Sequence, residues 1–368
     1  ANTQMTRATN MIEPLIKTQW KQSKPYNSLI PSLSANSEKF ATGCVATAMA
    51  QIMNYHKYPE QGNGSNSYSL KYNDKTVTFS ADFGNTTYNW DNLSDYYGEN
   101  ANEEEYYDVA KLMYHCGLSV DMLYDTSSNG GSGAYIYKVS DALINYFNYN
   151  KSLRYLQRRF YSDSEWEKLL YEELESGRPM LYGGSGSYGG HAFICDGYDG
   201  TTDKYHFNWG WGGSYDGYYS INGTGALAPL AFLGDVDKPG FTDEQEVIIG
   251  IRPNVGDNYA YTMGLDYEAG ETSPIKIDQA IVKRGDIFKV SCNLLNTSST
   301  TINAEIGVKI FNEKEDPIII KFYDLYDLKT NNYVSGEWSV NSISIPEGEY
   351  NVSLVFKTDN ECKDFQWN

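Results

Sequence analysis

Residues 41–59 read ATGCVATAMAQIMNYHKYP, with one cysteine directly behind a glycine. Apolar side chains recur at helical spacing from this point and a Tyr-Pro pair ends the run, which predicts a buried helix over residues 44–56. Cys44 stands in the first turn of that helix. Unpaired N–H groups at a helix N-terminus favour a thiolate over a thiol, so we expect a lowered pKa for this side chain. Read alone, Cys44 is most simply a small buried hydrophobe; read as an activated thiol, it is a nucleophile that requires a base.

The chain contains four histidines, so the search for that base is short. His191 lies in GSGSYGGHAFICDGYDG, at the start of an expected strand and after glycines that would let a substrate backbone approach closely. His56 is roughly three helical turns (~18 Å) from Cys44, which is too far. His115 ends a helical pattern and is read as structural, and His206, between two aromatic residues, is the weaker rival. We therefore expect His191 to be the base.

A catalytic imidazole also needs a partner that holds its tautomer, and an asparagine can do this for a Cys–His pair. Asn208 opens the motif NWGWGG, 17 residues after His191, and a hairpin could bring the two together across adjacent strands. Trp209 would cover their contact and exclude water; the alternative is a Gly/Trp turn with an aromatic core. The backbone N–H of Cys44 and the side-chain amide of Gln22, otherwise an ordinary loop residue, would supply the donors of an oxyanion hole.

The composition disfavours several classes of function. A formal net charge of −19, from 29 basic and 48 acidic side chains, repels phosphate backbones, so nucleic acid is not an expected partner. No apolar run approaches the ~20 residues of a membrane helix, so we expect no membrane insertion. The five cysteines are odd in number and show no CxxC spacing, which disfavours a zinc site and a disulfide scaffold.

Two domains are expected in a chain of 368 residues. Residues 1–252 show helical patterns followed by a run of short strands, which is typical of an α+β fold. Helices are expected at 7–18, 44–56, 101–116, 138–147 and 164–176. Strands are expected at MLYGG, AFICDGYDG, KYHFNW, GYYSIN and EVIIGI.

Residues 253–368 change to short alternating strands separated by turn signals. The segments DIFKVSCNLL, AEIGVKIF and YNVSLVFK alternate apolar and polar residues with a period of two. About 110 residues of this pattern predict an all-β, immunoglobulin-like sandwich. Cys292 is expected to face its core and is a candidate for a disulfide with Cys362, whereas Cys116 and Cys195 are expected to be buried thiols.

The order Gln22, Cys44, His191, Asn208-Trp209 resembles that of papain-type cysteine peptidases, in which the cysteine also precedes the histidine and the asparagine. The closer resemblance is to the streptopain family of bacterial cysteine peptidases, carried by WKQSKPYNSLIP, ATGCVATAMAQIMNYHKYP, SVDMLYDTSS, GGHAFICDGYDG, HFNWGWGGSYDGYYSIN and VIIGIRP. It implies a papain-like two-lobe fold for the first domain, with the β-sandwich added. By this resemblance Cys44 is the nucleophile, His191 the general acid/base, Gln22 the oxyanion donor, Asn208 the orienting residue and Trp209 its shield.

The resemblance further implies a bacterial endopeptidase that is secreted, or lies at the cell surface or in the periplasm. Its specificity would be broad, with a hydrophobic residue favoured second before the scissile bond. Its partners would be protein and peptide substrates and its own inhibitory N-terminal propeptide, and a chain that begins at Ala1 would be the mature form. No metal or organic cofactor is expected. The substrate cleft is expected beside the loop DTSSNGGSGAY and the glycines before the histidine, with Ser128, Gly133, Gly189 and Gly190 as binding residues.

Two other functions remain open at this point. The same Cys–His pair could serve a transamidase, which the products formed with an added amine acceptor would reveal. A non-catalytic adhesin or binding protein could also use a peptidase scaffold, although the intact set of four site residues argues against it.

Overall fold

The computed structural model describes residues 11–34, 37–98, 100–187, 189–223, 225–229, 240–256, 263–265, 275–298, 301–312, 314, 317–329, 332–358 and 361–364. The chain divides into two compact units, residues 1–158 with 167–257, and residues 159–166 with 258–368. Each unit has a hydrophobic core of its own. The first unit carries every candidate site residue.

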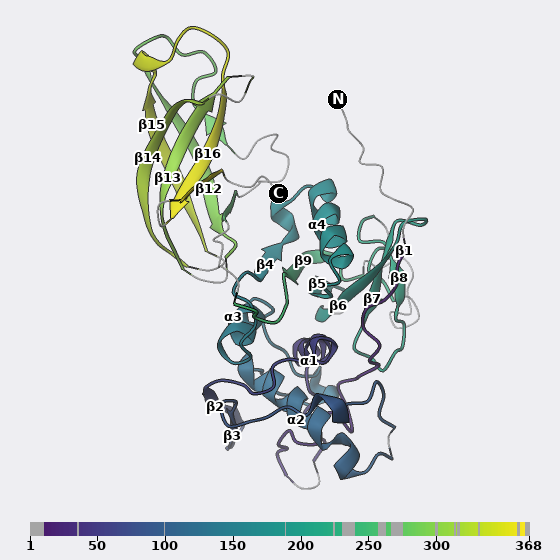
Figure 1. The fold of residues 1–368 in the computed structure, drawn as a ribbon. Helices are drawn as coiled ribbons and strands as arrows, with labels where there is room; N and C mark the ends of the chain where they lie inside the picture. The colour runs from purple at the N-terminus through teal and green to yellow at the C-terminus, as the bar shows by residue number, and fades with distance from the viewer. Residues whose placement is uncertain are drawn as a thin grey trace. The chain divides into compact units, whose positions relative to one another are not determined.

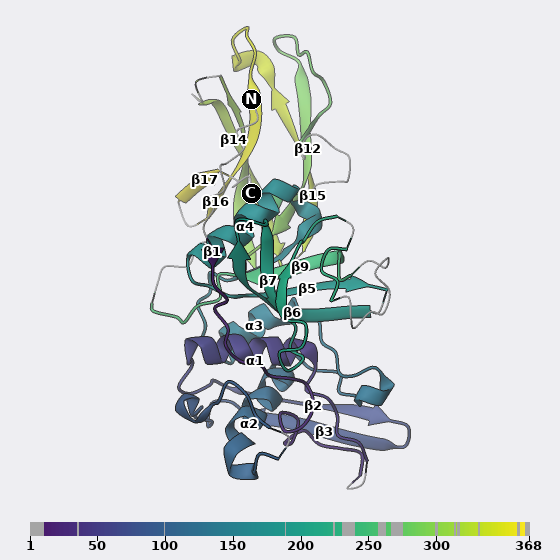
Figure 2. The ribbon, with the colours of Figure 1, turned by 90° about the vertical axis from the view of Figure 1, so that its right-hand side faces the viewer.

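The helical part of the first unit is built around α1 (Cys44–His56). Its side chains from Val45 to Met53 are all buried, because the helix contacts α2 on one side and strands β5 and β6 on the other (Figure 1 and Figure 2). A capping box between Asn102 and Glu105 starts α2. The elements of this part are α2 (Glu103–Ser119), α3 (Lys138–Asn145), the hairpin of β2 (Ser65–Tyr72) and β3 (Lys75–Asp82), and the single-turn 3-10 helices η1 (Trp90–Asn92) and η2 (Ser127–Asn129).

An antiparallel sheet forms the other part of this unit. Its strand order is β4-β9-β5-β6-β7-β8, and β1 pairs with the far end of β6. The strands are β1 (Met11–Ile12), β4 (Arg154–Gln157), β5 (Met180–Gly186), β6 (Gly189–Asp199), β7 (Lys204–Asn208), β8 (Gly217–Tyr219) and β9 (Asp243–Ile249). The short η3 (Arg158–Phe160) precedes α4 (Asp163–Glu175), which contacts β7 where the Tyr205 hydroxyl donates to the Glu167 carbonyl at 2.9 Å.

The predicted α+β content is confirmed, with one helix in error. The helix predicted at 44–56 has those bounds, and α2, α3 and α4 lie within a few residues of their predicted ranges. Of the helix predicted at 7–18, residues 7–10 lie outside the described residues, and the remainder is wrong. Met11 and Ile12 pair with β6, and the backbone N–H groups of Leu15 and Ile16 donate to Asp196, so tertiary contacts take the hydrogen bonds that a helix would need.

The described part of the second unit contains two antiparallel sheets that share one core. One has the order β10-β12-β11 with β15 also paired to β12, and the other has the order β14-β13-β16-β17. Val290, Val308 and Leu354, from three strands of the two sheets, are fully buried in that core. The elements are β10 (Met263–Leu265), β11 (Lys276–Ile277), β12 (Ile287–Asn296), β13 (Ile302–Phe311), β14 (Pro317–Leu328), β15 (Tyr333–Asn341), η4 (Ser342–Ser344), β16 (Asn351–Thr358) and β17 (Glu361–Asp364).

Three cysteines outside the candidate site are buried, as the sequence predicts, and the side chain of Cys362 lies outside the described residues. Cys116 and Cys195 belong to the first unit and Cys292 to the core of the second. Cys292 is a free thiol, which contradicts the suggested disulfide with Cys362.

Candidate active site

Gly43 sets the path by which the chain enters α1. Its φ is +86°, a left-handed value that favours glycine, and a Cβ at this position would lie 2.6 Å from Sδ of Met122 and 3.2 Å from the carbonyl oxygen of Ser132. Because glycine allows this close approach, the chain can turn sharply and begin the helix at Cys44. The Cys44 side chain is partly exposed, in contrast to the buried residues that follow it.

Two opposing effects act on the thiol of Cys44. Burial raises its pKa and is the larger effect, while hydrogen bonds from the backbone N–H groups of Ala192, Val45 and Cys44 itself lower it. The net shift is upward, opposite to the direction expected from the helix N-terminus alone, because burial disfavours the charged thiolate. The N–H of Ala192 belongs to β6 and directly follows His191. This contact therefore brings the thiol to the strand that carries the histidine.

The His191 ring, near the start of β6, is held by a backbone carbonyl. Its Nε2 lies 2.9 Å from the carbonyl oxygen of Trp209. A carbonyl can only accept a hydrogen bond, so Nε2 carries the proton and the neutral ring has its lone pair on Nδ1. Burial lowers the pKa of His191 to about 4, and the bond to Trp209 acts in the opposite direction. The imidazole is therefore neutral near pH 7, with Nδ1 able to accept a proton.

Aromatic rings enclose this imidazole. The ring of Trp211 stacks on it with centroids 4.8 Å apart, and the centroids of Phe241 and Phe193 lie at 5.3 and 5.8 Å. The fully buried Trp209 ring is farther away, at 6.3 Å. Trp211 therefore covers the imidazole more closely than Trp209, the residue expected from the sequence to shield it.

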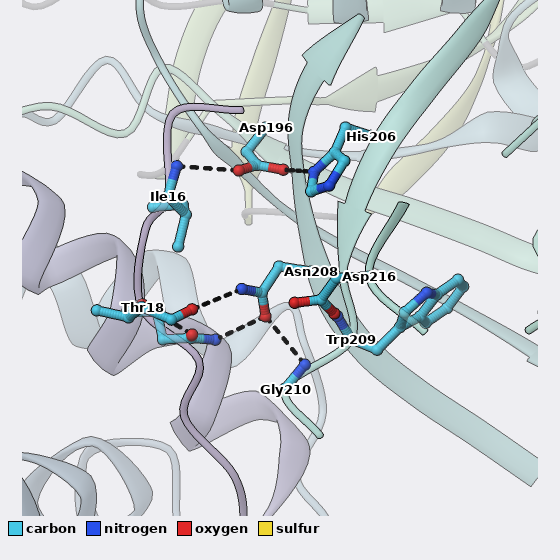
Figure 3. Close-up of polar contacts among 9 residues, drawn as sticks. Ile16, Thr18, Asp196, His206, Asn208, Trp209, Gly210 and Asp216 are labelled. Atoms are coloured by element: carbon cyan, nitrogen blue, oxygen red, sulfur yellow. Dashed lines mark hydrogen bonds and ion pairs between the residues drawn. The ribbon is translucent and has the colours of Figure 1, made fainter. Parts of the chain in front are cut away.

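The structure does not place the side chain of Asn208 on His191. Its Nδ2 donates to the carbonyl of Thr18 at 2.8 Å. Its Oδ1 accepts from Nε2 of Gln51 at 3.1 Å and from the backbone N–H of Gly210 at 3.0 Å (Figure 3). The direct contact expected from the sequence is therefore replaced by three others.

Strand register explains this difference. Asn208 lies opposite Ile194, three residues beyond His191, which corresponds to about 10 Å along a strand. The peptide unit between Trp209 and Gly210 fills the interval: its carbonyl contacts Nε2 of His191, and its N–H contacts Oδ1 of Asn208. Asn208 is thus connected to the histidine through one peptide unit. Gly210 adopts a left-handed φ of +69° to make this turn.

Gln22 lies in a segment that is bonded to both parts of the first unit. Its backbone carbonyl accepts from the N–H of Thr42 at 3.0 Å, two residues before Cys44. The carbonyl of Trp20 accepts from the N–H of Gly212 at 3.1 Å, in the turn between β7 and β8 on the histidine side. Gln22 is therefore beside the start of α1, as an oxyanion donor would have to be.

The loop expected to border the cleft is fixed beside the residues that precede Cys44. The buried Ser132, which the sequence did not single out, donates from Oγ to the carbonyl of Ala41 at 2.7 Å. Ser128 is exposed, and its Oγ donates to Glu38 at 2.6 Å. Gly133 is exposed as well, next to these contacts.

The two glycines before His191 are also exposed. Gly189 has a φ of +95°, and no atom of the described residues lies within 4 Å of where its Cβ would be. Gly190 continues the same strand and has only the carbonyl of Gly184 at that limit, 4.0 Å away. The backbone beside the histidine is therefore open to an approaching chain.

Two carboxylates, one fully buried and one half-buried, lie close to the site and were not predicted. Asp196, fully buried, has Oδ1 2.7 Å from Nδ1 of His206 and accepts the N–H of Ile16 on Oδ2 at 2.9 Å. Asp216 accepts the N–H of Trp209 at 2.8 Å, and burial raises its pKa to about 6 (Figure 3). His206, the rival base, is engaged by Asp196. The available signal was a charged residue inside an apolar strand, AFICDGY, just as Gln51 is a polar residue inside MAQIM.

Comparison with known proteins adds an independent observation. Residues 20–219, which include Gln22, Cys44, His191, Asn208 and Trp209, match the peptidase C10 family. The chain belongs to the peptidase C10 family. The resemblance to streptopain noted from the sequence is thereby confirmed.

Several known cysteine proteases are similar to this chain. The thiol protease/hemagglutinin PrtT of Porphyromonas gingivalis is 33% identical over 92% of this chain and 38% of its own length. Streptopain of Streptococcus pyogenes is 36% identical over 64% of this chain and 60% of its own length. The solved structure of the interpain A cysteine protease of Prevotella intermedia is 40% identical, with a TM-score of 0.59 over 67% of this chain and 96% of that one.

These comparisons identify the first unit as a papain-like cysteine peptidase domain of the C10 type. The chain spans 38% and 60% of the two curated relatives' lengths. Within the part of the chain that the structure describes, no helix is long and apolar enough to cross a membrane. In those same residues, histidine, cysteine and acidic side chains form no group of three that could hold a metal ion.

Proposed function

We propose that the protein is a cysteine endopeptidase in which Cys44 and His191 act as one catalytic pair. The observation that carries the proposal is the contact of Nε2 of His191 with the Trp209 carbonyl, since it leaves Nδ1 as the proton acceptor. The hydrogen bond from the N–H of Ala192 to the Cys44 thiol supports the same pairing. Membership of the C10 family supports it independently.

The reaction begins from an uncharged thiol and imidazole. As the sulfur of Cys44 bonds to the carbonyl carbon of the substrate, its proton moves to Nδ1 of His191. The histidine then passes this proton to the amine nitrogen while the peptide C–N bond breaks, which leaves a thioester. Nδ1 next takes a proton from water, whose oxygen attacks the thioester; the C–S bond breaks and the sulfur recovers the proton.

The negative charge on the substrate oxygen is stabilised by two donors. One is the backbone N–H of Cys44 at the start of α1, and the other is the side-chain amide of Gln22. The backbone hydrogen bond between Gln22 and Thr42 supports this role, because it holds the glutamine beside the helix start. The ring of Trp211 over His191 supports a reaction shielded from bulk water.

The substrate is a protein or peptide in extended conformation, with a hydrophobic residue favoured second before the scissile bond. The exposed backbone at Gly189 and Gly190 supports contact with a substrate main chain, since among the described residues no side chain lies within 4 Å of either Cβ position. The loop that contains Ser128 and Gly133 forms the opposite border. Cleavage profiling with a peptide library tests this preference.

The protein is secreted or displayed at a bacterial cell surface and is made as a zymogen with an inhibitory propeptide. A solved structure of a prointerpain A fragment from Prevotella intermedia, 39% identical over 67% of this chain, supports a precursor form in the family. Expression with the upstream coding sequence, followed by N-terminal sequencing of the active product, tests this.

The domain division is 1–252 for the catalytic domain and 253–368 for an immunoglobulin-like β-sandwich. The separate core of the second unit supports this division. PrtT, whose name includes hemagglutinin, matches 92% of this chain, and this favours attachment to cell surfaces as a second candidate function for the β domain. Agglutination of red cells by Cys44→Ala protein, which cannot hydrolyse peptides, separates attachment from proteolysis.

The main proposal is tested by replacing the nucleophile. We expect Cys44→Ala to abolish hydrolysis of a fluorogenic peptide mixture and to leave the thermal unfolding midpoint nearly unchanged. The matched control is Cys292→Ala, which removes a free thiol from the second unit and should retain activity. Retained turnover in Cys44→Ala would rule out the assignment.

A further inference from the structure

Gln51 is a buried polar residue in an apolar stretch of α1. It is 1% exposed, and its neighbours in MAQIM are all apolar. Burying an amide is unfavourable unless its hydrogen bonds are satisfied, whereas an apolar side chain would pack here without that requirement. Packing alone therefore does not explain a glutamine at this position.

The amide of Gln51 connects the three segments that carry the proposed site residues. The residue belongs to the helix that begins at Cys44. Its Oε1 accepts from Oγ1 of Thr18 at 2.8 Å and from the backbone N–H of Trp20 at 3.4 Å, in the segment that leads to the oxyanion donor. Its Nε2 donates to Oδ1 of Asn208 at 3.1 Å. Because Oε1 faces a backbone N–H, the orientation of the amide is fixed.

The hydrogen bonds continue from Asn208 to the histidine. Oδ1 of Asn208 also accepts the N–H of Gly210 at 3.0 Å (Figure 3). The same peptide unit presents the Trp209 carbonyl to Nε2 of His191 at 2.9 Å. A peptide whose N–H is bonded is a better acceptor at its carbonyl, since hydrogen bonds in series polarise one another. The series therefore runs from Gln51 to His191 through two intermediate groups.

The face of α1 that carries Gln51 also carries the thiol. Cys44, Thr47 and Gln51 stand at positions i, i+3 and i+7, which lie on one side of a helix. Gly210 packs against Thr47 so closely that a Cβ on the glycine would lie 3.2 Å from Cγ2 of the threonine. The turn that holds His191 therefore rests on the same helix face as the nucleophile.

We infer that Gln51 is a positioning residue for His191: it holds Asn208 so that the Trp209–Gly210 peptide aims its carbonyl at Nε2 and keeps Nδ1 free for Cys44. This inference rests on the proposed function for the role of His191. It assigns Asn208 an indirect role, through the peptide. It also makes the geometry of the pair depend on a residue two turns into the nucleophile helix.

Three variants test the inference. Gln51→Met keeps the shape of the side chain and removes its polar atoms. Thr18→Val removes only the hydroxyl that donates to Oε1 of Gln51, and it keeps the Thr18 carbonyl that binds Asn208. The matched control is Gln245→Met, since Gln245 is also buried and hydrogen-bonded, but to Arg158, Tyr182, Ile221 and Thr242.

The first measurement is the tautomer of His191, read at pH 7 from the ring nitrogen shifts of protein labelled with ¹⁵N-histidine. With four histidines in the chain, the spectrum can be assigned by substitution. We expect the Nε2–H tautomer in the native protein and in Gln245→Met, and a mixture of tautomers in Gln51→Met. Thr18→Val should lie between them, which provides a result even if Gln51→Met folds poorly.

The second measurement separates kcat from KM. We expect Gln51→Met to lower kcat about 10- to 100-fold, the range typical of a misplaced catalytic group, while KM changes little. An unchanged tautomer in Gln51→Met and Thr18→Val, or a loss of kcat equal to that of Gln245→Met, would overturn the inference. The tautomer is read without turnover, so a failure of the proposed peptidase activity would be recognised separately, from Cys44→Ala.

Discussion

At the scale of single residues, burial governs the charge of the proposed catalytic pair. It raises the pKa of Cys44 and lowers the pKa of His191 to about 4, so both shifts favour an uncharged thiol and imidazole. A thiolate–imidazolium pair in this site would be stabilised by mutual attraction and by the backbone N–H groups at the start of α1. The aromatic rings around His191 therefore raise the free-energy cost of transferring the proton from Cys44 to His191. They also exclude the water that would compete with the substrate.

The buried His115 is expected to make the stability of the fold depend on pH. Burial lowers its pKa to about 4, below the value of about 6.5 in an unfolded chain. The unfolded state therefore binds more protons in this window, and stability present above pH ~6.5 is lost as the pH falls toward 4. Between pH 7 and pH 5, we expect the free energy of unfolding to fall by about 2 kcal/mol less in His115→Asn than in the native protein. Urea titrations at the two pH values measure this, and equal falls would contradict it.

Asp216 is expected to affect stability with the opposite pH dependence. Burial raises its pKa to about 6, so the folded state binds more protons than the unfolded state, whose aspartates titrate near 4. The contribution of this residue to stability therefore increases as the pH falls from about 6 to about 4. Asp216→Asn keeps an oxygen for the Trp209 N–H, and we expect it to be at least as stable as the native protein at pH 7 and to lose that advantage by pH 4.5. Urea titrations at pH 7 and pH 4.5 give the free energy of unfolding of the variant minus that of the native protein. If this difference is more negative at pH 7 than at pH 4.5, the pKa of Asp216 is lowered by folding and the prediction is wrong.

At the scale of elements, the turn after β7 determines where the histidine partner lies. Gly210 has a left-handed φ of +69° and packs on Thr47 of α1. Any side chain here must strain the backbone and push the turn away from the helix. The carbonyl of Trp209, one residue earlier, would move with it.

Gly210→Ala is therefore expected to lower both stability and activity. A non-glycine residue in this conformation costs about 1–3 kcal/mol, and displacement of the carbonyl should lower kcat about 10- to 100-fold. The control is Gly223→Ala, which carries the same kind of strain at a φ of +83° and has no atom of the structurally described chain within 4 Å of the added Cβ. It should lose stability with kcat retained. Equal effects of the two variants on kcat would exclude a specific role for the turn.

The elements differ in how well the sequence predicts them. Apolar spacing and clear ends predict α1 and its neighbours because those signals are local. The stretch that contains Leu15 and Ile16 was wrongly predicted as helical, since its hydrogen bonds go to Asp196, far away in the sequence. The β2–β3 hairpin was missed, although SNSYSLKY and KTVTFSAD alternate around an Asn-Asp turn and carried the signal.

At the scale of the whole molecule, the sequence predicts which residues form the site better than how they contact one another. Gln22, Cys44, His191 and Asn208 all lie within the segment that matches the C10 family. The partner of His191 could not be predicted, because strand register depends on an irregularity between Cys195 and Gly197 that no local pattern reveals. A backbone carbonyl also has no signature in a sequence. Asn208, the residue predicted from the motif, is connected to His191 through one peptide unit and does not contact it directly.

The two hydrophobic cores predict two unfolding transitions. Leu354 is fully buried in the core of the second unit. We expect Leu354→Ala to destabilise that unit by about 3 kcal/mol, because it leaves a cavity, and to leave kcat and the transition of the first unit unchanged. Differential scanning calorimetry with parallel activity assays measures this. A single transition that shifts as a whole would show that the units unfold together.

The central claim is that Cys44 and His191 form one reactive pair, and covalent labelling tests it most directly. The protein is treated at pH 7 with an epoxide inhibitor of cysteine peptidases, and intact mass and peptide mapping locate the label in the native protein, His191→Ala and Cys292→Ala. We predict one label, on Cys44, in the native protein and in Cys292→Ala, and a large loss of labelling rate in His191→Ala. A label on another cysteine, or an unchanged rate in His191→Ala, would contradict the account.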